Sequence, residues 1–415
     1  MALWKRLSRR RILVFFAIVG PGIITASVDN DAGGIATYSI AGAHYGYTLL
    51  WSLIPISIAL IVIQEMAARM GAVSGRGLAD LIRENFGIKA TFYLMAALFV
   101  TNLGNTMAEF AGWAAAMEIF GVKRYISLPI GAFVVWWLVV KGTYKVVEKI
   151  FLVASAIYFT YVVSALLSRP PWGRVLQEVV TPEVRWDAPY LMLLIGMVGT
   201  TIAPWMQFYL QSAVVEKGIK PKDYQTTRWD VILGCLVTDL VALCIIVACA
   251  GTLFRHHIQI EGAKDAALAL APLAGKYASL LFAIGLANAS LFSACILPLA
   301  TAYYVCEGMG WEGGVNKSFR EAPQFFWIYT LLIILGAGSI LFPQMPLVPI
   351  MYLSQVINGI LLPFVLLFML ALVNNKEIMG EHTNKRIGNV IAWLTILGII
   401  AATAILVVTS LLGIG

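Results

Sequence analysis

The stretch GPGIITASVDNDAGGIATY (Gly20–Tyr38) places two carboxylates, Asp29 and Asp31, beside a pair of glycines in an otherwise apolar segment. Charged side chains are costly inside a lipid bilayer unless a partner or a water path compensates for them. We therefore expect a membrane-spanning helix that is interrupted at Asp31-Ala32-Gly33-Gly34. An interrupted helix frees backbone carbonyl groups, and these oxygens together with the two carboxylates would favour a cation.

The composition of the chain excludes a soluble domain with a polar surface. Hydrophobic residues make up 60% and charged residues 12% of the 415 residues, and the mean hydropathy is +0.84. Crossing a bilayer core of about 30 Å takes about 20 helical residues. Eleven stretches are long enough to span the core within the usual range of about 17–25 residues or more, namely 12–39, 47–70, 91–119, 125–141, 147–167, 190–214, 229–253, 271–305, 324–341, 347–373 and 388–411. We predict an all-α polytopic membrane protein.

The first stretch also resembles a secretory signal in one respect, because basic residues precede it. It is longer than a signal segment, contains two acids and lacks an A-x-A cleavage site. We therefore expect it to be a retained membrane helix.

The five cysteines have no C-x-x-C spacing, which argues against a zinc site or a disulfide framework and favours small buried side chains.

The basic residues behind the net charge of +7 are distributed as in a membrane protein, so the charge gives no reason to expect a nucleic-acid partner. Basic residues gather in segment 1–11, after the second stretch and after the fourth stretch, while Lys123 and Arg124 fall on the opposite side. Under the positive-inside rule the N-terminus is cytoplasmic and, with eleven spans, the C-terminus is external. We expect a basic segment at 1–11 and a single transmembrane domain over 12–411, functioning as a monomer in the lipid bilayer of the plasma (inner) membrane.

A second interruption is expected in the sixth stretch, LIGMVGTTIAPWMQFYLQSAVV (Leu194–Val215), around Thr200–Pro204. Either interruption alone could be a simple kink. Interruptions at corresponding places in two halves indicate an inverted-repeat transporter with its site near the bilayer midplane. We therefore predict a first repeat over 12–167, a second over 190–373 and an eleventh helix over 388–411.

Several segments then resemble one family in their order and spacing, across nearly all of the chain. They are GPG with Asp31, Gly33 and Ala36-Thr37, AGAHYGYTLLW, QEMAARMGAVSGRGLAD (Gln64–Asp80), GTTIAPW, YLSQVINGILLPF (Tyr352–Phe364) and NNKEIMGEHTN (Asn374–Asn384). The chain resembles the NRAMP divalent-metal transporters. The resemblance implies a LeuT-like fold, with two inverted five-helix repeats plus one extra C-terminal helix, and import of divalent metal ions.

The chain departs from the family pattern at both interruptions. The family's metal-binding asparagine is Gly34 here, its proline is Ala32, and its Met-Pro-His motif is Ala203-Pro204-Trp205. A methionine thioether favours manganese and iron over calcium and magnesium, because a soft ligand gives little to a hard ion. Its replacement predicts loss of that discrimination. The pattern is most similar to the magnesium-transporting branch of the family.

Two further departures concern protons. The family's third helix carries an acid three residues before a glutamate; the glutamate is Glu109, but the acid is replaced by Thr106. Together with Trp205 in place of a histidine, this removes two titratable groups to which the family's proton pathway is attributed. Proton coupling is therefore not expected.

The expected ion site combines the acids at the first interruption with polar and small residues of other helices. Smaller side chains at Gly34 and Ala203 would enlarge the cavity and suit Mg²⁺, which usually keeps several waters. The candidate ligand positions are Asp31, Asp29, Gly34, Ala203, Thr201, Gln207 and Gln355. The candidate positions on the ion path, or on the altered proton path, are Thr106, Glu109, Trp205 and Asp239.

Two polar positions and one polar stripe keep a second interpretation open. Gln355 matches a family position that approaches the ion, but it could instead join two helices by hydrogen bonds. Asp239 could line the ion path or form a structural hydrogen bond. Asn102 and Asn105 form one polar stripe with Glu109, which could face water or hold helices together.

Uptake without protons is energetically sufficient. A membrane potential of about 100 mV is worth roughly 2.3 kcal/mol per charge, hence about 4.6 kcal/mol for a divalent cation. At about 1.4 kcal/mol per factor of ten, this supports roughly a thousandfold accumulation. The expected function is a uniporter that imports Mg²⁺, and also Mn²⁺, by alternating access; the alternative is a proton-coupled Mn²⁺/Fe²⁺ importer.

Other classes of function fit the sequence less well. The chain has no H-E-x-x-H, no G-x-S-x-G and no Walker-type loop, so we do not expect an enzyme, and no resident cofactor is implied. A transporter of organic solutes would turn helix N-termini toward an anionic group, which the two aspartates would repel. A metal sensor that uses the same fold without transport stays open.

Overall fold

The computed structural model describes Thr25, residues 28–141 and residues 155–412. Every regular element within these ranges is a helix. The α-helices are α3 (Ala32–Tyr45), α4 (Leu53–Ser74), α5 (Leu78–Ile119), α6 (Arg124–Val140), α8 (Phe159–Leu167), α9 (Trp172–Val180), α10 (Ala188–Thr201), α11 (Pro204–Glu216), α12 (Tyr224–Thr252), α13 (Ala263–Ala267), α14 (Ala271–Ala274), α15 (Ala278–Met309), α16 (Pro323–Ile340), α17 (Leu347–Val373), α18 (Lys376–Met379) and α19 (Arg386–Leu412). The prediction of an all-α protein is confirmed.

Eight helical segments of the described ranges are long and apolar enough to cross a membrane. α6 is shorter, with 17 residues, and the expected stretches 12–39 and 147–167 lie partly outside the described residues. α5 is long because it joins two helices at Gly87, whose φ of 80° interrupts the helix. Eleven spans, and the limits of the two repeats, therefore stay predictions.

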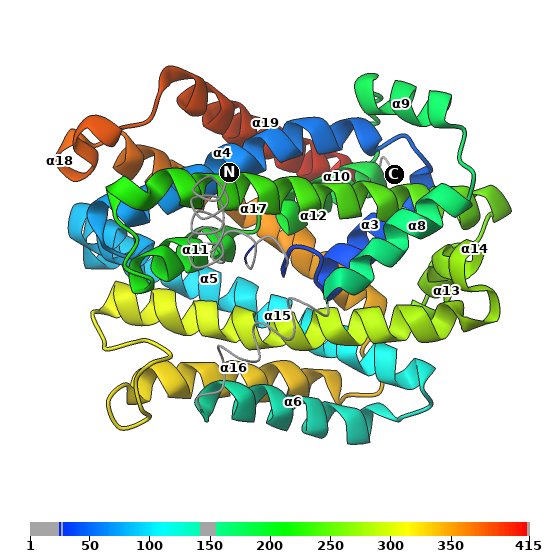
Figure 1. Ribbon diagram of the computed structural model, residues 1–415, viewed down its shortest axis with the longest axis horizontal. Coiled ribbons are helices and arrows are strands. Elements are labelled where there is room, and N and C mark those ends of the chain that lie inside the picture. Colours follow the sequence, from blue (N-terminus) through cyan, green and yellow to red (C-terminus); the bar gives the residue numbers. More distant parts are fainter. Residues whose placement is uncertain (1–24, 26–27, 142–154, 413–415) are drawn as a thin grey trace, which may run out of the picture.

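The two interrupted helices lie at the centre of the molecule (Figure 1). α3 packs against α12, α17, α10 and α5, and α11 packs against α4 and α15. The most apolar window of the α10–α11 segment is 83% buried by protein, whereas that of α19 is only 22% buried. Backbone that is not hydrogen-bonded within a helix is tolerated at membrane depth only inside protein or beside a water-filled cavity. The central position of the interruptions follows from this requirement.

The first interruption lies slightly earlier in the chain than the sequence suggested. Asp29 and Asn30 form a turn, and Asp31 is the extended N-cap residue of α3. Gly33 and Gly34 belong to the first turn of the helix and not to the unwound segment. The reason is that the Asp31 carboxylate accepts a hydrogen bond from the Gly34 amide, which starts the helix at once.

The second interruption lies at Ile202 and Ala203, between α10 and α11. Pro204 is the first residue of α11, where its missing N–H costs nothing because that amide has no partner in a helix. Its ring disfavours a helical conformation at Ala203, which is extended, with φ of −66° and ψ of 138°. Proline therefore both ends α10 and begins α11.

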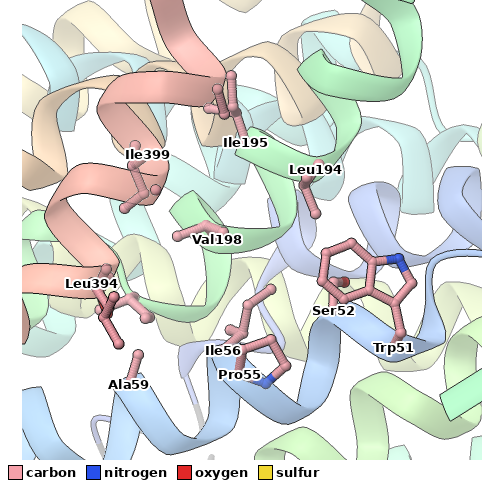
Figure 2. Close-up of a pocket in the computed structure, with 14 residues that line it drawn as sticks. Trp51, Ser52, Pro55, Ile56, Ala59, Leu194, Ile195, Val198, Leu394 and Ile399 are labelled. Atoms are coloured by element: carbon pink, nitrogen blue, oxygen red, sulfur yellow. The ribbon is translucent and has the colours of Figure 1, made fainter. Parts of the chain in front are cut away.

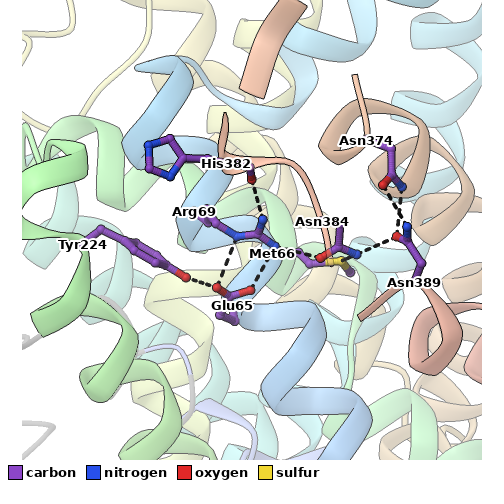
Figure 3. Close-up of polar contacts among 8 residues, drawn as sticks. All are labelled: Glu65, Met66, Arg69, Tyr224, Asn374, His382, Asn384 and Asn389. Carbon is purple, nitrogen blue, oxygen red and sulfur yellow. Dashed lines mark hydrogen bonds and ion pairs between the residues drawn. The ribbon is translucent and has the colours of Figure 1, made fainter. Parts of the chain in front are cut away.

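A polar cluster fastens α4 to two distant segments; we call it the Arg69 clasp (Figure 3). Arg69 forms an ion pair with Glu65 at 3.1 Å, one turn earlier on α4. Its guanidinium also donates to the carbonyl of His382 at 2.5 Å and to the side chain of Asn384 at 2.9 Å. The Tyr224 hydroxyl, at the start of α12, donates to Glu65. The clasp therefore joins α4, α12 and the connection between α17 and α19.

We expect Arg69→Leu to destabilise the protein strongly. The substitution leaves the mostly buried Glu65 without its cation and two acceptors without their donor, a change that costs about 3 kcal/mol or more. Thermal unfolding of the purified protein in detergent, followed by tryptophan fluorescence, should show a fall of several degrees. Arg76→Leu is the matched control, because the Arg76–Glu84 pair is exposed and should contribute about 1 kcal/mol at most. Equal losses in both variants would contradict this account.

Candidate metal centre

Two carboxylates meet at the N-terminus of α3. Oδ1 of Asp31 accepts from the Gly34 amide at 2.6 Å, and Oε2 of Glu109 on α5 accepts from the Ala32 amide at 3.3 Å. Free amides and the positive end of the helix dipole favour negative charge at this place. The charges of Glu109 and Asp31 lie close enough to interact. The structure thus brings Glu109, expected on the path, directly to the helix interruption.

A second pair of acids is formed by Asp29, in the turn before α3, and Asp239 on α12. Asp29 is 2% exposed, and neither of its carboxylate oxygens accepts a hydrogen bond within the described part of the chain. The titratable groups that act on it are Asp239 and Asp31, both of them acids. Asn30 donates to the hydroxyl of Thr238 at 3.4 Å, which links the turn to α12 beside Asp239. A buried carboxylate without a hydrogen-bond donor and beside two other acids can be ionised at low cost only if a cation binds it.

The second interruption supplies neutral oxygen atoms. The Thr201 hydroxyl donates to the Met197 carbonyl at 2.7 Å and lies 2.6 Å from the Tyr38 hydroxyl of α3. Oε1 of Gln207 is buried without a hydrogen-bond partner, while its amide nitrogen donates to the Ala203 carbonyl at 3.4 Å. The carboxyl end of α10 also carries partial negative charge. These groups suit a hard cation.

Gln355 reaches the first interruption from α17. It lies directly against Gly33, since a Cβ atom added to that glycine would collide with the Gln355 amide nitrogen and would lie 2.7 Å from Cδ. Oε1 of Gln355 accepts a hydrogen bond from Asn358 at 2.8 Å. The Gln355 side chain thus lies beside the first interruption, but its oxygen is hydrogen-bonded to Asn358.

The expectation that glycine at position 34 enlarges the cavity is wrong for this conformation. An added Cβ would collide with the carbonyl oxygen of Asp29 and lie 3.1 Å from the hydroxyl of Thr200. The turn at Asp29 therefore folds back over Gly34 and fills the space that a larger side chain would take. A nearby cavity beside Ala32 and Ile35 has a volume of about 10 Å³ and is lined by apolar side chains.

Thr106 and Trp205 are the two positions at which the sequence resemblance predicted the loss of titratable groups. The Thr106 hydroxyl donates to the carbonyl of Asn102 within its own helix, at 2.7 Å. Trp205 is 3% exposed and lies near Tyr209, with ring centroids 6.3 Å apart. Both side chains therefore fill space at their positions without offering a group that could carry a proton.

One thiol near the acids was not singled out from the sequence. Cys235 on α12 is buried and lies within electrostatic reach of Asp29 and Asp239. Its position one helical turn before Asp239 was the available signal, but the lack of paired cysteines hid it. Among the described residues, no three His, Cys, Asp or Glu side chains gather as a metal cage. An ion at this place would depend on carbonyl, amide or water ligands as well.

Larger cavities lie elsewhere. One of about 250 Å³ lies between α4, α10 and α19 and is lined by Trp51, Pro55, Ile56, Leu194 and other mainly apolar residues (Figure 2). Another of about 400 Å³ is lined in part by the acids Asp80, Glu216 and Glu307, which the sequence analysis did not select. Neither cavity is lined by the acids at the helix interruptions.

Two interrupted helices at the centre of a membrane-spanning bundle, with acids and oxygen atoms at the interruptions, define a transporter for cations. The chain belongs to the Nramp family, described as Natural resistance-associated macrophage protein-like, which matches residues 22–409. It is accordingly an integral membrane protein and a transporter of divalent metal ions, and it is not an enzyme.

Relatives share most of the chain's length. The protein is 29% identical to the "Divalent metal cation transporter MntH" of Deinococcus radiodurans over 406 residues, which cover 94% of this chain and 89% of that relative. It is 27% identical to the protein of the same name from Erwinia tasmaniensis, with 98% of each chain covered. The similarity therefore extends over the whole transporter.

Solved structures establish the fold. A manganese transporter of Eremococcus coleocola superposes with a TM-score of 0.74 at 19% identity, covering 95% of this chain and 86% of that one. MhsT in complex with L-phenylalanine superposes with a TM-score of 0.61 at 14% identity, covering 94% and 97%. The expected LeuT-like fold is confirmed.

We expect Gly34→Ala to reduce metal uptake about tenfold. The new methyl group would force the Asp29 turn away from α3, and strain of this kind costs about 1–3 kcal/mol. Uptake of Mn²⁺ and of Mg²⁺ into cells, normalised to membrane abundance, measures the effect. Gly104→Ala on α5 is the matched control, because an added Cβ there meets no atom within 4 Å. Wild-type uptake by Gly34→Ala would show that this close contact is unimportant.

Proposed function

We propose that the protein imports Mg²⁺, and also Mn²⁺, in a partly hydrated form, driven by membrane potential and uncoupled from protons. The observation that carries this proposal is the chemistry at the second interruption. Ala203 stands beside oxygen groups of Thr201 and Gln207 and offers no soft atom to the ion. A hard cation loses nothing from the absence of a thioether, whereas manganese and iron lose their preferred ligand.

In this proposal Asp31 and Asp29 provide the negative charge of the site. Asp31 keeps one oxygen on the Gly34 amide, so it is held in place as it contacts the ion or the water around it. Asp29 has no competing hydrogen bond and contributes charge from the turn. Mg²⁺ releases its waters reluctantly, so contacts through water suit a site with few charged ligands.

Asp239 and Glu109 are proposed to line the path of the ion. Both acids are buried beside the interruption, and they act on Asp29 and Asp31 respectively. Alternating access would then occur by movement of one repeat against the other around the fixed site. The proposed arrangement is that of the sequence analysis, with the N-terminus in the cytoplasm, the C-terminus outside and a monomer in the inner membrane.

The absence of proton coupling is proposed from Thr106 and Trp205. Neither side chain can accept and release a proton, and each occupies the place of a family group that could. The membrane potential alone supplies roughly 2.3 kcal/mol per charge at about 100 mV, which is sufficient for accumulation of an abundant divalent ion.

A proton-coupled manganese importer is the second candidate. The relatives from Deinococcus and Erwinia are named divalent metal cation transporters, and the solved protein from Eremococcus coleocola is a manganese transporter. Two features of this chain favour the same function. Cys235 offers a soft atom near Asp29 and Asp239, and Glu109 remains as a titratable group at the interruption.

Uptake into proteoliposomes at a fixed inside-negative potential tests the two candidates. We expect Mg²⁺ uptake without internal acidification, measured with a pH dye in the same vesicles, and uptake should fall at least tenfold in Asp31→Ala because the site loses its best-placed charge. Gln211→Ala on α11 serves as a control for a buried polar change away from the acids, since Gln211 donates to the carbonyl of Arg76. Exclusion of Mg²⁺, or acidification that follows Mn²⁺, would establish the second candidate instead.

Selectivity should respond to a restored thioether. We expect Ala203→Met to increase uptake of Mn²⁺ relative to Mg²⁺ about tenfold, equivalent to about 1.4 kcal/mol from one soft contact. Competition between the two ions in the same vesicles gives the ratio. Ala203→Leu adds a similar volume without sulfur and should not favour Mn²⁺. An unchanged ratio of Mn²⁺ to Mg²⁺ uptake in Ala203→Met would show that the missing thioether at position 203 does not set the ion preference.

A further inference from the structure

Four buried amide side chains connect α15 to the first interruption through α5 and α17. Asn102 donates to the Leu297 carbonyl at 3.1 Å and to the Thr301 hydroxyl at 2.8 Å. Asn105 donates to Asn102 at 2.9 Å and to Asn358 at 3.0 Å. Asn358 donates back to Asn105 at 3.0 Å and to Oε1 of Gln355 at 2.8 Å. We call these four side chains the amide chain.

The direction of every bond in the amide chain follows from its far end. A backbone carbonyl can only accept, so the nitrogen of Asn102 must face Leu297 and its oxygen must face Asn105. The nitrogen of Asn105 is then used as a donor, and its oxygen accepts from Asn358. The second hydrogen of the Asn358 amide is left for Gln355. Oε1 of Gln355 is therefore bound to Asn358.

This direction decides which atom of Gln355 faces the helix interruption. With Oε1 on Asn358, the amide nitrogen lies nearest to Gly33 and donates to the Ser354 hydroxyl at 3.2 Å. An amide nitrogen is a donor only and cannot bind a metal ion. Gln355 is thus oriented away from coordination in this conformation.

The amide chain is complete, which makes this orientation stable. All four side chains are 1% exposed, and none of their polar atoms is left without a hydrogen bond. Buried amides that are fully paired are expensive to reorient, because each broken bond leaves a donor or acceptor unsatisfied.

We propose that Asn358 is a positioning residue for ion binding, because it holds the Gln355 oxygen away from the site until the ion competes for it. Gln355 then becomes a ligand, directly or through water, only when its bond to Asn358 breaks. The affinity of the site is lowered by the free energy of that one hydrogen bond. This inference rests on the proposed function only in taking Gln355 as an ion ligand.

The test is a double-mutant cycle between Asn358→Ala and Gln355→Ala, with Mn²⁺ as the probe. A buried hydrogen bond of about 0.5–1.5 kcal/mol corresponds to roughly a threefold to tenfold change in affinity. We expect Asn358→Ala to lower the KM for Mn²⁺ uptake threefold to tenfold in the wild-type background and to leave it unchanged in the Gln355→Ala background.

A purely structural role of Asn358 gives a different result. Thermal stability and maximal uptake rate would fall by similar amounts in both backgrounds, while KM would not depend on Gln355. That outcome would overturn the proposal. Asn389→Ala is a control for the loss of a reciprocal amide pair, because Asn389 and Asn374 also exchange two bonds of 2.9 Å, at an exposed place beside the Arg69 clasp. It should leave KM unchanged.

A second variant keeps the test valid if Asn358→Ala does not fold. Gln355→Glu leaves Asn358 intact and lets one carboxylate oxygen keep its bond while the other faces the ion. We expect it to lower KM more than Asn358→Ala does. An unchanged or higher KM would contradict the proposal.

The outcomes also separate this inference from the proposed function. Mn²⁺ uptake that does not depend on Asp31 would contradict the proposed site as a whole. A different result would overturn only the role of Asn358. In that case uptake would depend on Asp31, but Asn358→Ala would change KM equally with or without Gln355, or not at all.

Discussion

The bond between the Asp31 carboxylate and the Gly34 amide starts a helix in the middle of the molecule, and the rest of the site depends on it. A helix that begins at this depth has free amides, and Asp31 and Glu109 satisfy two of them. The turn that precedes the helix brings Asp29 over Gly34. Because charge and unpaired backbone are both costly in lipid, the surrounding helices must bury this turn completely.

The helices around the interruption differ in chemistry. α12 adds Asp239 and Cys235 beside Asp29, whereas α17 and part of α5 add the neutral amide chain beside Gly33. In the proposed function, the acids would attract the ion, and the amide of Gln355 would at first present its nitrogen to it. Binding would therefore reorganise the neutral side and leave the charged side in place. In the proposed function, the charged side and the neutral side of the interruption would therefore have distinct roles around one ion.

The sequence predicted the general features of the site because they depend on local chemistry. Acids beside paired glycines, and a proline after small polar residues, disfavour a continuous helix locally, so both interruptions could be placed to within a few residues. Proline alone would not have been enough, because Pro129, Pro298 and Pro363 lie inside helices. The sequence could not show that Asp29 covers Gly34, because a glycine beside open space and a glycine against backbone cannot be told apart in a sequence. It also could not show which amide atom of Gln355 lies against Gly33, since that depends on a carbonyl of another helix.

Taken by itself, the sequence determined an all-helical membrane transporter, its family and the presence of acids at a helix interruption, since hydropathy and residue order are properties of the chain. The tertiary structure alone decided which side chains meet. Asn102 and the carbonyl of Leu297 are 195 residues apart, yet their contact sets the direction of the whole amide chain. Asp239 likewise acts on Asp29 only because α12 packs against α3. Such contacts depend on how helices pack, which no local pattern records.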